Sequence, residues 1–150
     1  MKRIYTCSGD EGDTGLVDGT RITKADLRIA AEGDLDELIS VLGWARAACD
    51  DRETSSLIET IQSHLFELGS GKTLDPGPLE VEIDRYARQM PPITGFVIPS
   101  GPESSARLHI ARTVCRRAER AFVRANLRHA LPFLNRLSDL LFILACRKRD

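Results

Sequence analysis

The sequence has few of the residues that form covalent or metal cross-links. Only four of its 150 residues are cysteines, namely Cys7, Cys49, Cys115 and Cys146, and no two of them form a CxxC pair. No histidine lies at metal-ligand spacing beside them, and the three histidines are scattered along the chain. We therefore expect neither a zinc site nor a disulfide framework, and we interpret the thiols as reduced residues that are packed or half-exposed.

An excess of one charge and long apolar runs are missing as well. The 21 basic and 22 acidic residues give a net charge of −1, so no overall field attracts nucleic acid or membrane, and any anion site must be local. No apolar run is expected to be long enough to span a bilayer, and the N-terminus lacks the apolar core of a signal peptide. These absences predict a cytoplasmic protein that binds neither nucleic acid nor membrane.

The periodicity of α-helices is present. Apolar residues recur at steps of three and four in four long segments. The first ends near residue 48, the second covers about residues 54–68, the third covers about 103–126, and the fourth follows a break near residues 130–132. A shorter helix is expected at 79–89, and Thr54 is expected to cap the second long helix. There is no βαβ alternation. The predicted fold class is all-α, a five-helix up-and-down bundle in a single domain, residues 1–150.

Residues 1–25 are expected to form an irregular arm, in which IYT is at most a short extended piece. The stretch YTCSGDEGDTGL contains three glycines and three acids and almost nothing apolar, so it cannot bury itself. One interpretation is a flexible surface loop. The other is a phosphate site, because glycine lets backbone N–H groups approach an anion and Thr and Ser add donors. The acids would then require a bridging metal ion such as Mg²⁺.

The segment GSGKT at residues 69–73 is similar to the end of a phosphate-binding P-loop. However, Phe66 occupies the position of the first glycine of GxxxxGK[ST], and the segment follows a helix rather than a strand. We interpret it as a linker.

Polar residues cluster on the last two helices. Arg112, Arg116, Glu119 and Arg120 share one broad helical face, from which Arg117 points away. This face is either solvated, with internal Glu–Arg pairs, or a local anion site, since the planar arginine fork grips phosphate well.

The final helix carries a polar stripe formed by Asn135, Ser138 and Asp139, which must pair with the arginine helix or line a ligand site. Asp36 or Glu37 of the first helix could face an arginine.

Taken together, these segments resemble the PduO-type ATP:cob(I)alamin adenosyltransferase family over nearly the whole chain. YTCSGDEGDTGL is similar to the family's YTxTGDxGxTxL arm, RITKADLR to RVxKxDxR, DLDELIS to VDELNS, and FVIPSG to F(I/V)(L/I)PGG. ARTVCRRAER and LNRLSDLLFILA resemble the family's two strongest motifs almost letter for letter.

The resemblance implies an enzyme that transfers the 5′-deoxyadenosyl group of ATP to cob(I)alamin. The cobalt nucleophile attacks C5′ of ATP, triphosphate leaves, and adenosylcobalamin forms. The resemblance further implies a homotrimer with active sites between adjacent subunits, ATP and cobalamin as substrates and Mg²⁺ as a cofactor. It also allows a reductase as a partner.

The resemblance also assigns roles to residues, without naming a direct metal ligand. The residues expected to wrap the ATP phosphates with Mg²⁺ are Thr6, Ser8, Gly9, Asp10, Gly12, Thr14 and Lys24. The nucleotide side is expected to include Arg116, Glu119, Arg120 and Asn135. Arg116 is also expected to act in catalysis, with Asp36 and Arg112 pairing across the subunit interface. Phe96 is expected to lie against the lower face of the corrin and displace the axial base.

Four positions depart from the family pattern. Ala30 replaces a glutamate, Ile39 an asparagine, Ser100 a glycine and Ser8 a threonine. The first two substitutions keep an alternative open, namely a catalytically weakened paralogue that binds ATP or cobalamin as a carrier or sensor. A structural helical bundle and a metal-binding ferritin-like bundle are further alternatives, and the last is the weakest because the chain has no ExxH pair.

Overall fold

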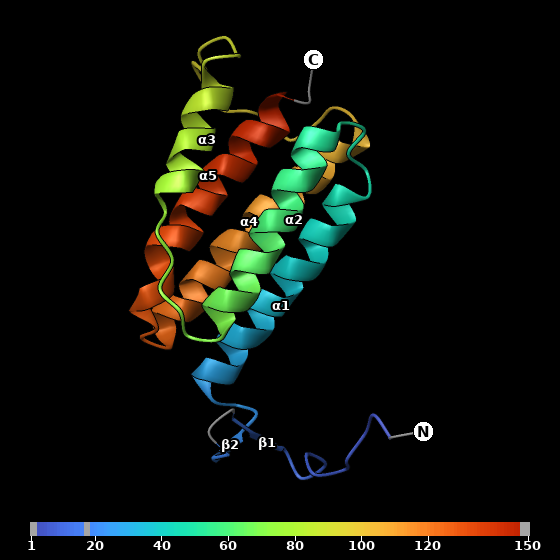
Figure 1. Cartoon of the computed structure of the whole chain (residues 1–150), viewed down its shortest axis with the longest axis vertical. Coiled ribbons are helices and arrows are strands. Elements are labelled where there is room, and N and C mark those ends of the chain that lie inside the picture. Colours follow the sequence, from blue (N-terminus) through green and yellow to red (C-terminus); the bar gives the residue numbers. More distant parts are fainter. Residues whose placement is uncertain (1–2, 17–18, 148–150) are drawn as a thin grey trace.

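The computed structural model describes residues 3–16 and 19–147. These residues form five α-helices and one small hairpin (Figure 1). The helices are α1 Leu27–Arg46, α2 Arg52–Gly69, α3 Gly77–Ala87, α4 Glu103–Arg124 and α5 Leu131–Arg147, with a short 3₁₀ turn, η1 Arg128–Ala130, before α5. The hairpin consists of β1 Asp13–Gly15 and β2 Arg21–Thr23.

The helices run up and down along one axis, as predicted (Figure 1). α4 packs against both α1 and α5, α2 packs on α1, and α3 packs on α5. Contacts between side chains show the helix directions. Arg46 of α1 meets Glu59 of α2, as antiparallel neighbours do, whereas Glu80 and Tyr86 of α3 meet Arg136 and Arg147 of α5 in parallel order. The all-α five-helix bundle is therefore confirmed.

α5 is the most apolar helix and contributes a large part of the core. Its buried apolar residues include Phe133, Leu134, Leu137, Leu140, Leu141 and Leu144. By length and composition alone, the 20 residues Arg128–Arg147 could cross a membrane, so the expectation that no run is long enough was wrong on that test. In the structure 56% of the 18-residue apolar window within this segment is buried inside the bundle, which is how a core helix behaves.

Thr54 was predicted to be the N-cap of α2, but the N-cap is Asp51. Asp51 has an extended backbone, and its Oδ1 accepts a 2.7 Å hydrogen bond from the backbone N–H of Thr54. Both residue types can cap a helix, but only the residue just outside the first turn can reach those N–H groups. Thr54 already lies in the first turn, where it is fully buried.

The GSGKT segment ends α2 rather than holding a phosphate. The backbone N–H groups of Ser70, Gly71 and Lys72 donate to carbonyls of the last helical turn, between Phe66 and Leu68. Gly71 has a φ of +89°, the left-handed conformation that commonly closes a helix. Because these three N–H groups are used, they are not available to cradle an anion, in agreement with the linker interpretation.

We expect Gly71→Ala to lower the free energy of unfolding by about 1 kcal/mol, because a side chain at positive φ is strained. Gly33 gives a control of opposite sign. It lies exposed within α1 with open space around its Cα, so Gly33→Ala should raise the free energy of unfolding by about 0.5–1 kcal/mol. Chemical denaturation measures both values, and a stabilising Gly71→Ala would contradict the cap.

The predicted irregular arm contains a hairpin. β1 and β2 pair antiparallel with Thr14 opposite Ile22, whereas residues 4–6 are not part of a strand. Thr14 and Ile22 are half-buried while their strand neighbours are exposed, which is the alternation of a short strand pair. Residues 1–2 and 17–18 of the predicted arm lie outside the described residues. The arm projects from one end of the bundle (Figure 1).

Candidate functional site

The arginines of α4 have two different roles. Arg117 pairs with Asp34 at 3.4 Å and with Glu37, so it joins α4 to α1 and points away from the other arginines, as predicted. Of the two candidates Asp36 and Glu37, it is therefore Glu37 that faces an arginine within the chain. Arg116 and Arg120 are exposed, and neither has an ion pair or a side-chain hydrogen bond with another described residue. Two guanidinium groups are thus available to an external anion.

Arg112 lies one turn before Arg116 and is half-buried. Its guanidinium carbon lies 5.9 Å from the centroid of the Phe142 ring of α5. Its Nε atom is buried and has no hydrogen-bond partner among the described residues. A buried donor without a partner is costly. Because this Nε is closed to solvent, only the Nη groups of the half-buried side chain can donate to a group outside the chain.

The polar stripe of α5 is mostly satisfied by its neighbours. The Asn135 Nδ2 atom donates to the Glu119 Oε1 atom of α4 at 3.2 Å, and Ser138 donates to the Asn135 carbonyl at 2.9 Å. Asp139 is exposed. Burial raises the pKa of the nearby Cys115 thiol far above its ordinary value, and the carboxylates of Glu119 and Asp139 raise this pKa further. The thiol therefore stays neutral and does not act as a nucleophile.

The arm folds around two basic residues. Lys24 Nζ donates to the Gly9 carbonyl at 2.7 Å, and Arg21 donates to the Ser8 carbonyl at 2.6 Å. A Cβ added at Gly9 would lie 3.1 Å from both Lys24 Nζ and the Asp13 carbonyl, so only glycine fits without displacing a neighbour. Sequence reasoning missed Arg21, although it lies three residues before Lys24 in the family-like segment.

The remaining arm residues are open to solvent. Thr6 and Ser8 share a 2.8 Å hydrogen bond between their hydroxyl groups. Asp10 and Gly12 are exposed, and Gly12 has a φ of +92°. Thr14 is half-buried in β1. The arm thus presents hydroxyls and a glycine loop held by Lys24, and its contact with phosphate stays a prediction.

Asp36 and Phe96 lie apart from these groups. Asp36 is exposed in a groove of about 220 Å³ between α1 and α2, whereas Arg112 faces α5, so the two do not meet within one chain. Phe96 is fully exposed in the loop 88–102, beside a hollow of about 410 Å³ lined by residues 90–97 and Cys146. This loop and the arm lie at opposite ends of the bundle (Figure 1). One chain therefore does not bring all the predicted site residues together.

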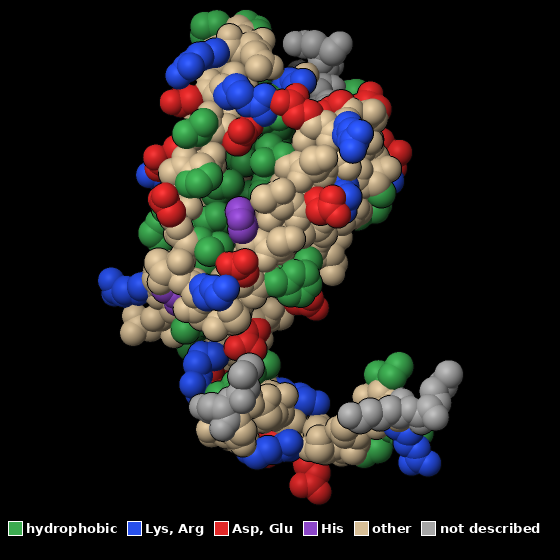
Figure 2. Space-filling view, in the orientation of Figure 1, with side chains coloured by type: hydrophobic (Ala, Val, Ile, Leu, Met, Phe, Trp, Pro, Cys, Tyr) green, Lys and Arg blue, Asp and Glu red, His purple; other side chains and the backbone are tan. Residues whose placement is uncertain are grey.

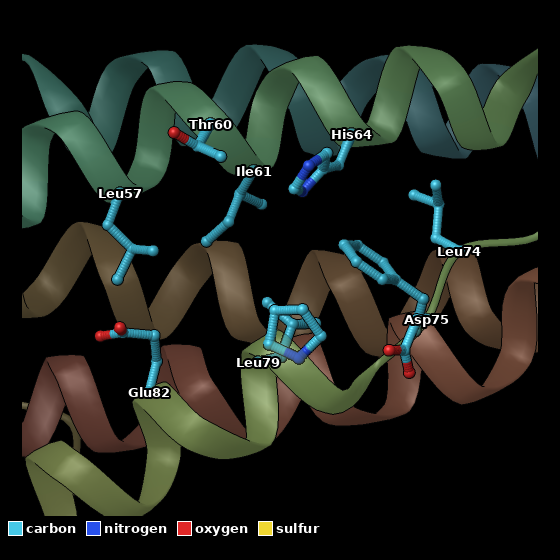
Figure 3. Close-up of a pocket in the computed structure, with 10 residues that line it drawn as sticks. Leu57, Thr60, Ile61, His64, Leu74, Asp75, Leu79 and Glu82 are labelled. Atoms are coloured by element: carbon cyan, nitrogen blue, oxygen red, sulfur yellow. The ribbon is translucent and has the colours of Figure 1, made fainter.

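A separate apolar cavity was not predicted. It has a volume of about 380 Å³, and its lining comes from α2, α3, α5 and the linker before α3, as Leu57, Thr60, Ile61, His64, Leu74, Asp75, Pro78, Leu79, Glu82 and Phe133 (Figure 3). The His64 ring points into it and meets Phe133 edge-on, with centroids 6.0 Å apart. Figure 2 shows apolar side chains along the same furrow between α3 and α2. No described arm residue and no α4 residue lines this cavity.

Known proteins resemble this chain over nearly its full length. The sequence model of the family described as cobalamin adenosyltransferase matches residues 4–148. A cobalamin adenosyltransferase of Cupriavidus metallidurans is 42% identical over 97% of this chain and 87% of that protein. A corrinoid adenosyltransferase of Bos taurus is 39% identical over 97% of this chain and 70% of that protein.

Comparison with solved structures leads to the same family as comparison of the sequences. A variant PduO-type ATP:corrinoid adenosyltransferase from Lactobacillus reuteri, complexed with cobalamin and ATP, has a TM-score of 0.90 and 32% identity, covering 98% of this chain and 92% of that one. Another variant from the same organism, complexed with ATP, has a TM-score of 0.87 and 34% identity, covering 97% of this chain and 92% of that one. Because sequence and fold agree over almost every residue, the chain belongs to the cobalamin adenosyltransferase family.

Proposed function

We propose that this chain transfers the 5′-deoxyadenosyl group of ATP to cob(I)alamin and releases triphosphate. Family membership supports the activity, and the related Lactobacillus reuteri protein binds both cobalamin and ATP. The observation that carries the proposal is the exposed pair Arg116 and Arg120, beside the Glu119–Asn135 contact, in a protein of net charge −1. Two guanidinium groups on one helix face, neither paired with a described residue, suit a polyphosphate, which gains negative charge as it leaves.

We propose that each active site is completed by a neighbouring subunit of a homotrimer. Arm and Phe96 loop lie at opposite ends of one bundle, and Asp36 and Arg112 face different helices. A neighbour's arm could cover the α4 arginines, and a neighbour's Asp36 could accept hydrogen bonds from the Nη groups of the half-buried Arg112. This arrangement would bring together groups that a single chain keeps apart.

Mixing two inactive variants tests the shared site. Lys24→Ala disables the arm and Arg116→Ala disables the arginine face, so each variant alone should be nearly inactive. In randomly mixed trimers about a quarter of the sites would combine an intact arm with an intact arginine face, so about a quarter of wild-type activity should return. The variants are unfolded together and refolded, and activity is compared with that of separately refolded samples. No recovery in verified mixed oligomers would place both groups in one subunit.

Mg²⁺ is proposed to bind with the triphosphate. Within residues 3–16 and 19–147, no group of three or more His, Cys, Asp or Glu side chains could hold a metal ion. Mg²⁺ commonly uses substrate phosphates, water and only one or two carboxylates, so the exposed arm acids Asp10 and Glu11 fit such a role. When bound, the ion would neutralise part of the triphosphate charge.

The departures from the family pattern leave the fold unaffected. Ile39 is buried, and its carbonyl accepts a 2.9 Å hydrogen bond from Gln62. Ala30 is exposed. The carrier or sensor alternative rests on these two residues, and it predicts ATP binding without turnover. A cytoplasmic location and a reductase that supplies cob(I)alamin remain proposals that rest on the sequence and the resemblance.

The activity is tested under anaerobic conditions with chemically reduced cob(I)alamin and Mg-ATP. The corrinoid spectrum is followed for adenosylcobalamin. Product that requires both protein and ATP would establish the enzyme. A folded protein that binds ATP but forms no product would favour the carrier alternative.

A further inference from the structure

A chain of hydrogen bonds connects the short helix α3 to the nucleotide side of the proposed site. Glu80 of α3 accepts from the Arg136 Nε atom of α5 at 2.8 Å. The Arg136 Nη1 atom donates to the Asn135 Oδ1 atom at 2.7 Å, and the Asn135 Nδ2 atom donates to the Glu119 Oε1 atom of α4 at 3.2 Å. We infer that Arg136 and Glu80 are positioning residues that hold Asn135 and Glu119 ready for ATP. This inference rests on the proposed function.

The chain of contacts selects one orientation of the Asn135 amide. An arginine side chain can only donate hydrogen bonds, so the amide atom that faces Arg136 must be the oxygen. The amide nitrogen then faces Glu119, whose carboxylate can only accept. Both neighbours therefore favour the same one of the two amide orientations.

The orientation of the amide determines what Glu119 does. Glu119 follows Arg116 by three residues on α4, so its carboxylate could reach and neutralise Arg116. In the structure the Glu119 carboxylate accepts a hydrogen bond from Asn135. Neither Arg116 nor Arg120 has an ion pair with a described residue. A flipped amide would turn its oxygen toward the carboxylate and drive Glu119 toward Arg116. The anion site would then lose positive charge.

Glu80 in turn holds Arg136. The Arg136 and Glu80 side chains are 42% and 51% exposed, and ion pairs with this exposure contribute little to folding. None of the residues predicted for the nucleotide site lies on α3. This contact matters little for stability but orients an active-site amide. Its loss should therefore weaken ATP binding and leave the melting temperature unchanged.

The test compares Arg136→Met and Glu80→Gln with a matched ion pair far from the site. Arg46 and Glu59 join α1 and α2 at 2.7 Å with similar exposure, so Arg46→Met and Glu59→Gln serve as controls. We expect Arg136→Met to raise KM for ATP about tenfold, because a charge-assisted hydrogen bond is lost. KM for cob(I)alamin should change much less. Glu80→Gln should show a smaller increase, because its amide oxygen still accepts.

Arg136→Lys adds a second check. A lysine keeps the charge but has no planar fork that can reach Glu80 and Asn135 at once, so it should restore KM for ATP only in part. Melting temperatures of all variants should stay close to that of the wild type.

If the wild type is active and folded Arg136→Met has the same KM for ATP, the inference is overturned. Equal KM increases in the Arg46 and Glu59 controls would also overturn it. If the wild type itself makes no adenosylcobalamin, the proposed function fails instead. ATP affinity measured by calorimetry then still tests the positioning: an equal affinity in wild type and Arg136→Met would refute it.

Discussion

Replacing Arg116 with alanine is expected to lower kcat/KM for adenosyl transfer by about 10²–10³-fold, the usual cost of removing one group that stabilises developing charge. Arg116 is exposed and has no ion pair with a described residue, so its guanidinium contributes little to the folded state. The melting temperature should therefore move by no more than about 1 °C. Activity and thermal unfolding are measured on the same preparation.

Arg124 provides the matched control for this experiment. It is an exposed arginine two turns further along α4, in the last turn of the helix. Arg124→Ala should leave activity close to that of the wild type, because it lies outside the predicted site. A melting temperature that collapses in Arg116→Ala, with activity per folded molecule unchanged, would remove Arg116 from the site and return it to a structural role.

Replacing Phe96 with alanine is expected to slow the reaction that starts from cob(II)alamin with a reductant far more than the reaction that starts from pre-reduced cob(I)alamin. The resemblance gives Phe96 the task of displacing the axial base, which matters only while cobalt still has to be reduced. We expect the two rate losses to differ by at least about tenfold, equivalent to about 1.4 kcal/mol of barrier. Because Phe96 is fully exposed, its loss should not alter stability.

Ile98 is the control for Phe96, since it is an exposed apolar residue of the same loop. Ile98→Ala should reduce both reactions by similar, small factors. Equal losses from both cobalt states in Phe96→Ala would show that Phe96 only contributes binding surface. The assay follows adenosylcobalamin spectroscopically from each starting state.

Much of the fold and part of the site could be predicted from the sequence. Apolar residues such as Leu35, Leu38 and Leu42 repeat at helical spacing, and all three are buried in α1. The orientation of Arg117 away from Arg116 also followed from spacing alone, because 100° per residue separates neighbours on a helix. The short order-dependent motifs of the arm, α4 and α5 were sufficient to suggest the family that the comparisons show.

Local competition between similar residues was harder to predict. Asp51 and Thr54 are both good capping residues, and Asp51 caps α2 because it lies just before the first turn. The hairpin in the arm was missed because a strand pair of three residues each has too little alternation to be recognised. Glycines in the arm also weaken any strand pattern.

The sequence by itself determined where helices form and which motifs are present, because both depend on residues within a few turns of each other. Only the tertiary structure decided which distant groups meet. Glu80 and Arg136 are 56 residues apart, and Arg117 and Glu37 are 80 residues apart, so their contacts depend on how the helices pack. The cavity beside His64 and the opposite placement of arm and Phe96 loop arise in the same way. They result from the packing of whole elements, which no local sequence pattern encodes.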